Sequence, residues 1–343
     1  MSLRPGPRNS ITDIDGLLVG HATDERIGSG VTVIRCAGQW VAAVDIRGGG
    51  PGVRETETLS PENIVGGIHA IALSGGSVFG LAAADGVMGY LSERQVGMRL
   101  RPGGRAIPIV PGAVLHDLNN QGDKDWGELS PYRDLGARAV AAAGTDFALG
   151  SVGAGRGAMA GYVKGGIGTA SLDLGDGLVV AALVAVNPVG SVYMPDGRTF
   201  WAWPYEIDGE FGGHRPAPHT PPVSDPTPDH TRLRDLGRLQ PGANTTLAVV
   251  ATNAAIDKLE AKRIAIMAQD GLARAIRPVH TPFDGDLVFA IGSGAVALGD
   301  ERTRQWQTAR IGAAAADVLA RAIARGVYHA SGNDGVAASN CAV

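Results

Sequence analysis

The stretch Thr246-Leu-Ala-Val-Val-Ala-Thr252, followed closely by the segment Lys258–Ala275, carries the clearest indication of the fold. The first stretch is short and rich in β-branched residues, which predicts a buried strand. The second begins with a capping-box pair, Asp257 and Glu260, and continues with apolar residues at helical spacing. A buried strand beside an amphipathic helix indicates an α/β protein.

The same two patterns recur along the chain. Buried strands are also predicted at Val31–Arg35, Trp40–Ile46 and Leu178–Val186. Helices are also predicted at Ser77–Leu91, Arg133–Ala143 and Trp306–Ala324. Because wholly apolar strands alternate with helices, we expect sheets that helices cover on their outer faces.

The composition narrows the class of protein. Of the 343 residues, 44% are apolar and 19% are charged, as in an ordinary folded domain. The 51 glycines are spread through apolar stretches, which suits close packing of helices and strands rather than disorder. The net charge of −4 offers no electrostatic reason to expect nucleic acid or an anionic membrane as a partner.

Signals for membrane insertion, secretion and cofactor binding are weak. No segment approaches the roughly 20 apolar residues that span a bilayer. The start MSLRPGPRNS lacks the apolar core of a secretory signal, and the two cysteines can pair at most once. The glycine-rich stretches 48–50 and 153–157 lack the spacing of a dinucleotide or phosphate loop, and the eight histidines lack metal-ligand spacing. We therefore expect a cytoplasmic protein without a cofactor or a metal.

Residues 204–241 do not match a packed element. They include eight prolines and few aliphatic residues, which predicts an exposed connection. A buried strand follows almost at once, and neither an internal repeat nor a second core is evident. We therefore expect residues 1–343 to form a single domain interrupted by this loop.

Asn244 and Thr245 stand where this loop enters the strand. Threonine commonly opens strands, so a purely structural role is one interpretation of Thr245. In the other, the Thr245 hydroxyl attacks the carbonyl of Asn244, an N-to-O acyl shift follows, and hydrolysis of the ester frees Thr245 as a new N-terminus. Its α-amino group, with an ordinary pKa of about 7.7–8.0, would then be a base beside the hydroxyl.

Other polar residues are candidates for the same site. Asp284 and Asp286 precede an apolar run and, at a spacing of two, project from one face of a strand. Paired carboxylates can position a hydroxyl and hold an amine, although Asp-Gly also occurs in turns. Asn187 ends another apolar run, where it either donates to an oxyanion or starts a turn. Lys164 is a lone cation among small residues, either reaching solvent or facing the carboxylates.

Together these pieces resemble the L-aminopeptidase/D-esterase family of self-processing hydrolases, which includes β-aminopeptidases and nylon-oligomer hydrolases. The similarity runs from Ile11 to about Tyr328. It rests on the order and spacing of the motifs Ile11–His21, Asp45–Gly50, Leu73–Leu81, Val186–Gly190 and Asn244–Thr246.

The resemblance implies a four-layer αββα sandwich. It also implies a precursor that cuts itself after residue 244, into an α chain of residues 1–244 and a β chain of residues 245–343, and a tetramer of αβ units. By position, Thr245 would be the nucleophile and Asn187 an oxyanion donor. Asp284 and Asp286 would orient Thr245 and accept an amine.

A few positions distinguish the branches of the family. The aminopeptidase branch has Ser as nucleophile and Ser and Glu in place of the two aspartates, so Thr245 with two aspartates is closer to the nylon-hydrolase branch. Lys164 matches a lysine that neighbours the nucleophile in that branch. His116, within Val114-Leu-His-Asp117, stands where that branch has Tyr, and we expect it to contact the substrate.

Three functions are compatible with these residues. The first is an amide hydrolase, acting as an aminopeptidase on small peptides or as a hydrolase of 6-aminohexanoate (nylon-6) and other ω-amino-acid oligomers. The second is an acyltransferase of the ornithine acetyltransferase type, a family that also cuts itself before Thr. The third is a non-catalytic binding protein. The complete set of site residues disfavours the third function, and the glycine-rich motifs favour the hydrolase.

Overall fold

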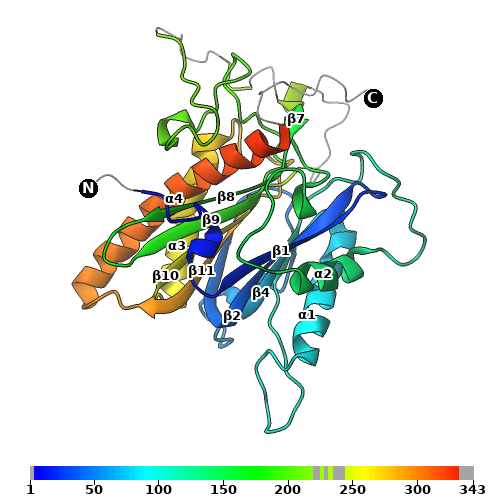
Figure 1. The fold of residues 1–343 in the computed structure, drawn as a ribbon, viewed down its shortest axis with the longest axis vertical. Coiled ribbons are helices and arrows are strands. Elements are labelled where there is room, and N and C mark those ends of the chain that lie inside the picture. Colours follow the sequence, from blue (N-terminus) through cyan, green and yellow to red (C-terminus); the bar gives the residue numbers. More distant parts are fainter. Residues whose placement is uncertain (1–3, 219–224, 228–230, 235–243, 332–343) are drawn as a thin grey trace.

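The computed structural model describes residues 4–218, 225–227, 231–234 and 244–331 (Figure 1). The strands of the main sheet are β1 (Leu17–Asp24), β2 (Ser29–Ile46), β3 (Gly52–Arg54), β4 (Ile68–Ser74), β5 (Gly112–Val114), β8 (Ile167–Asp173), β9 (Val179–Ala185), β10 (Leu247–Ala254) and β11 (Leu287–Val296). Two short strands, β6 (Met159–Ala160) and β7 (Val163–Lys164), pair with each other. The α-helices are α1 (Ala83–Glu93), α2 (Tyr132–Ala141), α3 (Lys258–Ala275) and α4 (Glu301–Ser331).

Strand β2 joins two halves of the sheet, whose strand order is β3-β5-β4-β2-β11-β10-β9-β8. Its first part pairs with β4 and β1, and its second part pairs with β11. The two strands predicted at Val31–Arg35 and Trp40–Ile46 are therefore one strand with an irregular register between Arg35 and Trp40. That prediction was wrong because the exposed Ala37 and Gln39 interrupt the apolar pattern while the backbone stays extended.

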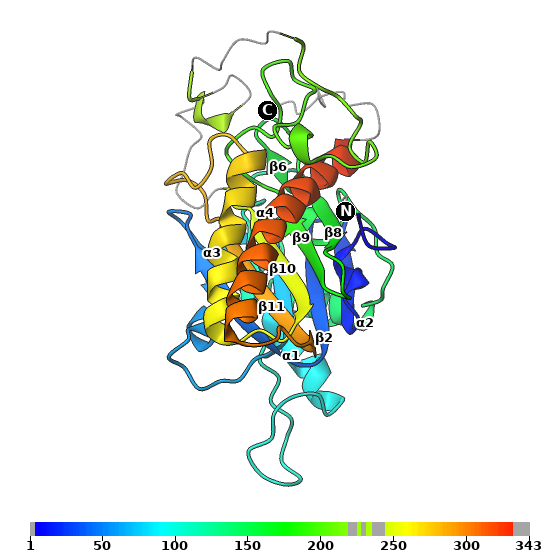
Figure 2. The same ribbon diagram turned by 90° about the vertical axis from the view of Figure 1, so that its left-hand side faces the viewer.

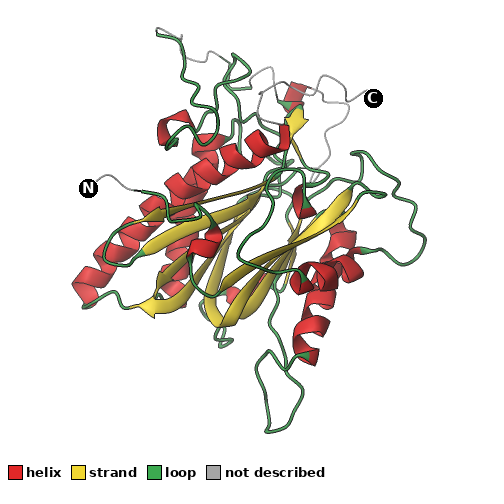
Figure 3. Ribbon diagram, in the orientation of Figure 1, coloured by secondary structure: helices red, strands yellow, loops and turns green. Residues whose placement is uncertain are grey.

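Three apolar cores separate the layers of the fold. In β10, Leu247 and Val249 pack between the two halves of the sheet, whereas Ala248 and Val250 belong to the core that α3 and α4 cover. A third core lies between the β1–β2–β4 half and helices α1 and α2. Figures 1, 2 and 3 show the two helix pairs on the outer sides of the strands. The expected four-layer αββα sandwich is confirmed.

The helices follow the predicted pattern most closely where local signals are strong. Helix α3 has the predicted bounds, and its capping box forms, with the Glu260 N–H 2.8 Å from Asp257 Oδ1. Helix α4 extends the predicted Trp306–Ala324 at both ends. The predicted helix at Ser77–Leu91 starts as a 3-10 turn before it continues as α1. Among the helices of the described residues, none combines the length and apolarity needed to cross a membrane.

Two glycines allow α1 and α2 to pack at short range. A Cβ atom at Gly86 would lie 1.9 Å from the carbonyl oxygen of Arg133. At Gly136 it would lie 2.1 Å from the carbonyl oxygen of Ala83. Since no side chain fits at these distances, the close approach requires glycine at both positions, as the glycine-rich composition predicts.

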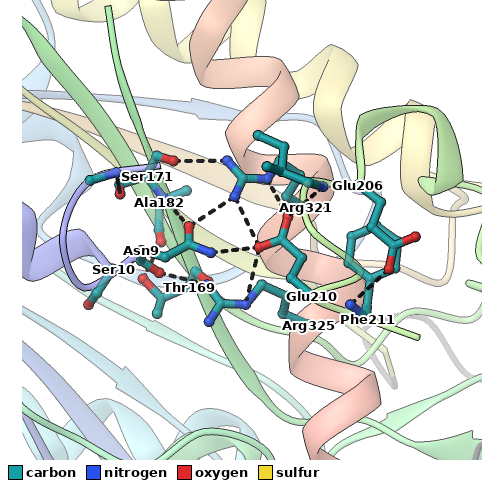
Figure 4. A network of polar contacts seen from close by, with 12 residues as sticks. Asn9, Ser10, Thr169, Ser171, Ala182, Glu206, Glu210, Phe211, Arg321 and Arg325 are labelled. Carbon is teal, nitrogen blue, oxygen red and sulfur yellow. Dashed lines mark hydrogen bonds and ion pairs between the residues drawn. The ribbon is translucent and has the colours of Figure 1, made fainter. Parts of the chain in front are cut away.

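A buried network of charged side chains ties α4 to segments far away in the sequence (Figure 4). Arg321 is 1% exposed and lies 2.5 Å from Glu210, while Arg325 lies 3.5 Å from the same carboxylate. Arg321 also donates to the carbonyl oxygen of Ser171 on β8 and to the side chain of Asn9, at 2.8 and 2.9 Å. The network therefore joins α4 to the N-terminal segment, to β8 and, through Glu210, to the first part of the proline-rich stretch 204–241.

The proline-rich stretch 204–241 is described only in part. Residues 219–224, 228–230 and 235–241 lie outside the described residues. Of the others, Phe211 and Thr231 are buried, and the Phe211 ring packs 5.4 Å from that of Phe200. The sequence predicted that this stretch is exposed. That prediction is wrong for part of it, because Phe211 packs into the core that α3 and α4 cover.

Candidate active site

The strand pairing brings the predicted site residues to one place. Strands β9 and β10 are antiparallel, with Ala185 opposite Leu247, while β10 and β11 are parallel, with Leu247 opposite Leu287. The end of β9 and the beginnings of β10 and β11 therefore meet at the same edge. Five predicted residues lie within three positions of these strand ends, and each is at most 2% exposed: Asn187, Asn244, Thr245, Asp284 and Asp286.

The peptide bond between Asn244 and Thr245 is held on both sides. The carbonyl oxygen of Asn244 accepts a hydrogen bond from the backbone N–H of Gly285 at 2.8 Å, and the N–H of Thr245 donates to the carbonyl oxygen of Asn187 at 2.8 Å. The Thr245 hydroxyl donates to the Asn244 carbonyl oxygen. The hydroxyl thus lies against the carbonyl group that it would attack, and an N–H already polarises that carbonyl.

Gly285 separates the two aspartates and approaches the hydroxyl closely. A Cβ atom there would lie 2.6 Å from Thr245 Oγ1 and 2.8 Å from the carbonyl oxygen of Gly50. A side chain at this position would displace the hydroxyl. Glycine is therefore required between the two aspartates because space is lacking, and not because the chain turns there.

Asp284 is buried and surrounded by donors. Its Oδ1 accepts from the N–H of Val189 at 3.0 Å, and its Oδ2 accepts from the N–H and the hydroxyl of Thr281 at 3.1 and 2.5 Å. Burial raises the pKa of this carboxyl to about 7, and the charge of Asp286 acts in the same direction, against the opposing effect of the hydrogen bonds. Asp284 therefore changes its protonation near neutral pH.

Asp286 is bound by a different set of donors. Its Oδ1 accepts from the N–H of Thr246 at 2.7 Å. Its Oδ2 lies 3.1 Å from the backbone nitrogen and 3.0 Å from Nδ1 of His280. The consecutive residues His280 and Thr281 thus each hold one aspartate with a backbone N–H and a side chain.

Sequence reasoning missed His280 and Thr281, although both stand shortly before Asp284. The only available signal was a polar pair in the turn that precedes the acidic residues. A third missed residue is Arg232, whose guanidinium binds the side chain of Asn244.

Asn187 contacts the site through both its backbone and its side chain. Its Oδ1 accepts from the N–H of Met159 at 2.9 Å, and its Nδ2 donates to the carbonyl oxygen of His116 at 3.3 Å. These bonds fix the orientation of the amide. Because an amide carries two donor hydrogens and His116 accepts one, the second can serve an oxyanion.

His116 contacts the cluster through its carbonyl oxygen, which accepts from Asn187, whereas Lys164 bonds to Gln121, a residue outside the cluster. His116 is half-buried; burial lowers the pKa of its imidazole, against the opposing charge of Asp117. Its Nε2 is buried and finds no hydrogen-bond partner within the described segments. Lys164, on β7, is half-buried and donates to the side chain of Gln121 at 3.4 Å. Within the described residues, no group of three or more His, Cys, Asp or Glu is arranged to hold a metal.

Solved structures share this architecture. The L-aminopeptidase D-Ala-esterase/amidase of Ochrobactrum anthropi, described as a new variant among the N-terminal-nucleophile hydrolase fold, aligns with a TM-score of 0.67 at 20% identity, over 96% of this chain and 88% of its own. A β-aminopeptidase of Burkholderia sp. aligns with a TM-score of 0.66 at 24% identity, over 95% and 88%. The chain thus has the fold of the N-terminal-nucleophile hydrolases.

Sequence comparison narrows this class to a family. A protein of Mycobacterium tuberculosis described as an uncharacterized aminopeptidase is 45% identical over 338 residues, 94% of each chain. A 6-aminohexanoate-oligomer endohydrolase of Kocuria sp. is 31% identical over 319 residues, 90% of this chain and 82% of its own. The model of peptidase family S58 matches residues 9–340, and the chain belongs to this family. It is a hydrolase of amide bonds, and the resemblance seen in the sequence is confirmed.

Proposed function

We propose that the chain cuts itself between Asn244 and Thr245, and that the freed Thr245 then hydrolyses amide bonds in small peptides or ω-amino-acid oligomers. The observation that carries the proposal is the geometry of the scissile bond. The Thr245 hydroxyl lies against the Asn244 carbonyl, and the N–H of Gly285 lies 2.8 Å from its oxygen. That N–H can stabilise the negative charge that develops on the oxygen during attack.

After cutting, the same hydroxyl would serve each turnover. The new amine of Thr245 would act as its base, and the carbonyl of Asn187, which accepts the amide hydrogen before cutting, can hold the amine. Asp286 would orient this end of the chain through its bond to the N–H of Thr246, and Asp284, whose backbone pairs with that of Asn244, would act beside it. The second amide hydrogen of Asn187 would donate to the oxyanion of the substrate.

We assign Lys164 and His116 to supporting roles. The carboxylates favour the ammonium form of the Thr245 amine, whereas a lysine opposes them and lowers the pKa of the amine. Lys164→Met should therefore move the rise of turnover with pH to higher pH, and an unchanged profile would exclude this role. His116 presents a ring nitrogen that has no partner in the described segments, so we propose that it contacts the substrate.

Two amide substrates follow from the relatives. The protein that is 45% identical carries the name of an aminopeptidase, and the one that is 31% identical that of an oligomer endohydrolase. The pair of aspartates beside a threonine supports the second substrate as much as the first, because buried carboxylates can bind the amine of either. We also propose that four αβ units assemble, which sedimentation of the processed protein tests directly.

The test combines processing and turnover. The purified protein should run as two chains, with the smaller one beginning Thr-Thr-Leu-Ala. It should release product from a panel of amino-acid p-nitroanilides or from 6-aminohexanoate oligomers. Acyl transfer to an added amine in place of water would indicate an acyltransferase instead. A single intact chain with full activity would refute self-cleavage.

A further inference from the structure

Arg232 reaches back from the proline-rich stretch to the residue at which we propose that the chain is cut. We propose that Arg232 is a positioning residue for self-cleavage, because its guanidinium holds the Asn244 side chain and thereby keeps the Asn244 carbonyl in front of the Thr245 hydroxyl. This inference rests on the self-cleavage proposed above and adds a residue that the resemblance to the family did not indicate.

The contacts of Arg232 are directed and come from three parts of the residue. Its Nη1 donates to Asn244 Oδ1 at 2.9 Å, and its Nε donates to the carbonyl oxygen of Gly161 at 2.8 Å. Its backbone N–H lies 3.1 Å from the carbonyl oxygen of Val189. The preceding residue, Thr231, is fully buried. The guanidinium is planar, so two fixed bonds orient it and determine where the Asn244 side chain can lie.

The hydrogen bond from Arg232 to the Asn244 side chain adds to the hydrogen bonds that the backbone of Asn244 makes. On one side, the N–H of Asn244 donates to the carbonyl oxygen of Phe283 at 3.3 Å, and its carbonyl accepts from Gly285 at 2.8 Å. Arg232 holds the side chain, the other substituent of the same Cα. With both held, rotation of the carbonyl away from Thr245 Oγ1 is restricted. Reactions of this kind depend steeply on such alignment, with a misplacement of about 1 Å costing on the order of 10²-fold.

The self-cleavage step that Arg232 assists needs no proton from the guanidinium. A bond forms between Thr245 Oγ1 and the Asn244 carbonyl carbon, the bond from that carbon to the Thr245 nitrogen breaks, and the hydroxyl proton ends on that nitrogen. Water then adds to the ester, which produces the carboxylic acid of Asn244 and restores the hydroxyl. The guanidinium remains protonated throughout, so its part is to orient and not to transfer a proton.

Arg232 and Arg234 lie on one short 3-10 turn, Arg232–Arg234, and Arg234 provides a matched control. It donates to Asp225 at 2.6 Å, and its side chain is 45% exposed. Arg232→Met and Arg234→Met each remove one guanidinium from the same turn, but only the first removes the bond to Asn244 Oδ1. A general loosening of the turn would affect both variants alike.

The experiment follows the 35.1 kDa full chain after cell-free synthesis and measures its conversion into two chains by electrophoresis. We expect Arg232→Met to slow conversion by on the order of 10-fold or more, and Arg234→Met to change it by less than about 2-fold. In an Asn244→Ala background, Arg232→Met should have little further effect on cutting, because the bond to Asn244 Oδ1 is already absent and, of the two guanidinium bonds to Asn244 and Gly161, only the one to the Gly161 carbonyl is lost. Thermal unfolding of both arginine variants in a Thr245→Ala background, where no cutting occurs, shows whether the fold is retained.

The outcomes separate the two proposals. A wild-type chain that stays intact after cell-free synthesis refutes self-cleavage itself. If the wild type cuts and Arg232→Met cuts equally fast, the role of Arg232 is wrong. It is also wrong if Arg232→Met slows cutting by the same factor in the Asn244→Ala background as in the wild-type background, since Arg232 would then act only on the fold.

Discussion

Two buried polar clusters of this protein differ in the sign of the charges that they bring together. In the cluster of Figure 4, the carboxylate of Glu210 lies between Arg321 and Arg325, so unlike charges meet. At the starts of β10 and β11, the charge of Asp286 acts on Asp284, and the described residues surround both carboxylates with hydrogen-bond donors, including the imidazole of His280 beside Asp286. Both clusters lie out of the water that would otherwise solvate them.

The two clusters also differ in how the pKa values of their charged groups are shifted. Burial lowers the pKa of Arg325, and the charge of Glu210 opposes this. Burial raises the pKa of Asp284 to about 7, and the charge of Asp286 acts in the same direction. Unlike charges thus compensate each other and bind segments together, whereas burial beside a like charge raises the pKa of an acid to near neutral pH. The second arrangement is typical of catalytic sites.

The charged network also bears on the proposed cut. Asn9, Ser171 and Glu210 belong to the proposed α chain, and Arg321 belongs to the proposed β chain. Their contacts do not involve the bond between Asn244 and Thr245. The network would therefore continue to hold the two chains together once that bond is broken.

The largest expected effect is the loss of self-cleavage and amide hydrolysis when Thr245 is replaced, while the charged network stays intact. Thr245→Ala should abolish both cutting and turnover, because in the proposed mechanism one oxygen serves both steps. The adjacent Thr246→Val keeps the backbone N–H that donates to Asp286 and should still be cut. Electrophoresis and an amide-hydrolysis assay check both variants, and cutting by Thr245→Ala would exclude this hydroxyl as the nucleophile.

The next effect concerns the charged network and should spare the chemistry. In the uncut Thr245→Ala background, Arg321→Met leaves Glu210 buried with less compensation and should lower the free energy of unfolding by about 3–5 kcal/mol. Adding Glu210→Gln should recover part of the loss, since the uncompensated charge is then gone. Urea unfolding measures both changes. A loss below about 1 kcal/mol would show that the network contributes little.

A smaller effect is expected from the side-chain amide of Asn187. Asn187→Ala removes the side-chain donor but keeps the carbonyl that accepts from Thr245. Turnover of the processed enzyme should fall by on the order of 10²-fold if this amide stabilises the oxyanion. Steady-state rates on an active p-nitroanilide measure it, and an unchanged kcat would assign the amide to a structural role.

The smallest effect is a dependence of stability on pH. The pKa of Asp284 is raised from 3.8 to about 7 in the folded protein, so the folded state retains a proton that the unfolded state has lost. This stabilisation is fully present below about pH 4 and is lost as the pH rises through 7. In the Thr245→Ala background, Asp284→Asn should remove a decline on the order of 1–2 kcal/mol between about pH 5 and 7. Urea unfolding at several pH values measures the free energy of unfolding of Thr245→Ala with and without Asp284→Asn. Identical pH dependences of the two variants would contradict the raised pKa of Asp284.

Local patterns predicted the elements better than their pairing. Helix α3 was predicted with its observed bounds because the capping box and the apolar stripe lie within the segment itself. Strand β2 was predicted as two strands because its continuity depends on partners far away in the chain, β4 for one part and β11 for the other. Burial within the proline-rich stretch, as at Phe211, also depends on distant residues of the core that α3 and α4 cover.

The sequence by itself determined the residues available for chemistry: a threonine at the entry to a strand, two aspartates spaced by two, and an asparagine at the end of another strand. These follow from short-range spacing and from the order of the family motifs. Only the tertiary structure decided that His280, Thr281 and Arg232 hold these groups, and that Asp284 titrates near pH 7. The physical reason is that burial, donor geometry and the distance between two carboxylates depend on how separate strands pair, which no local pattern specifies.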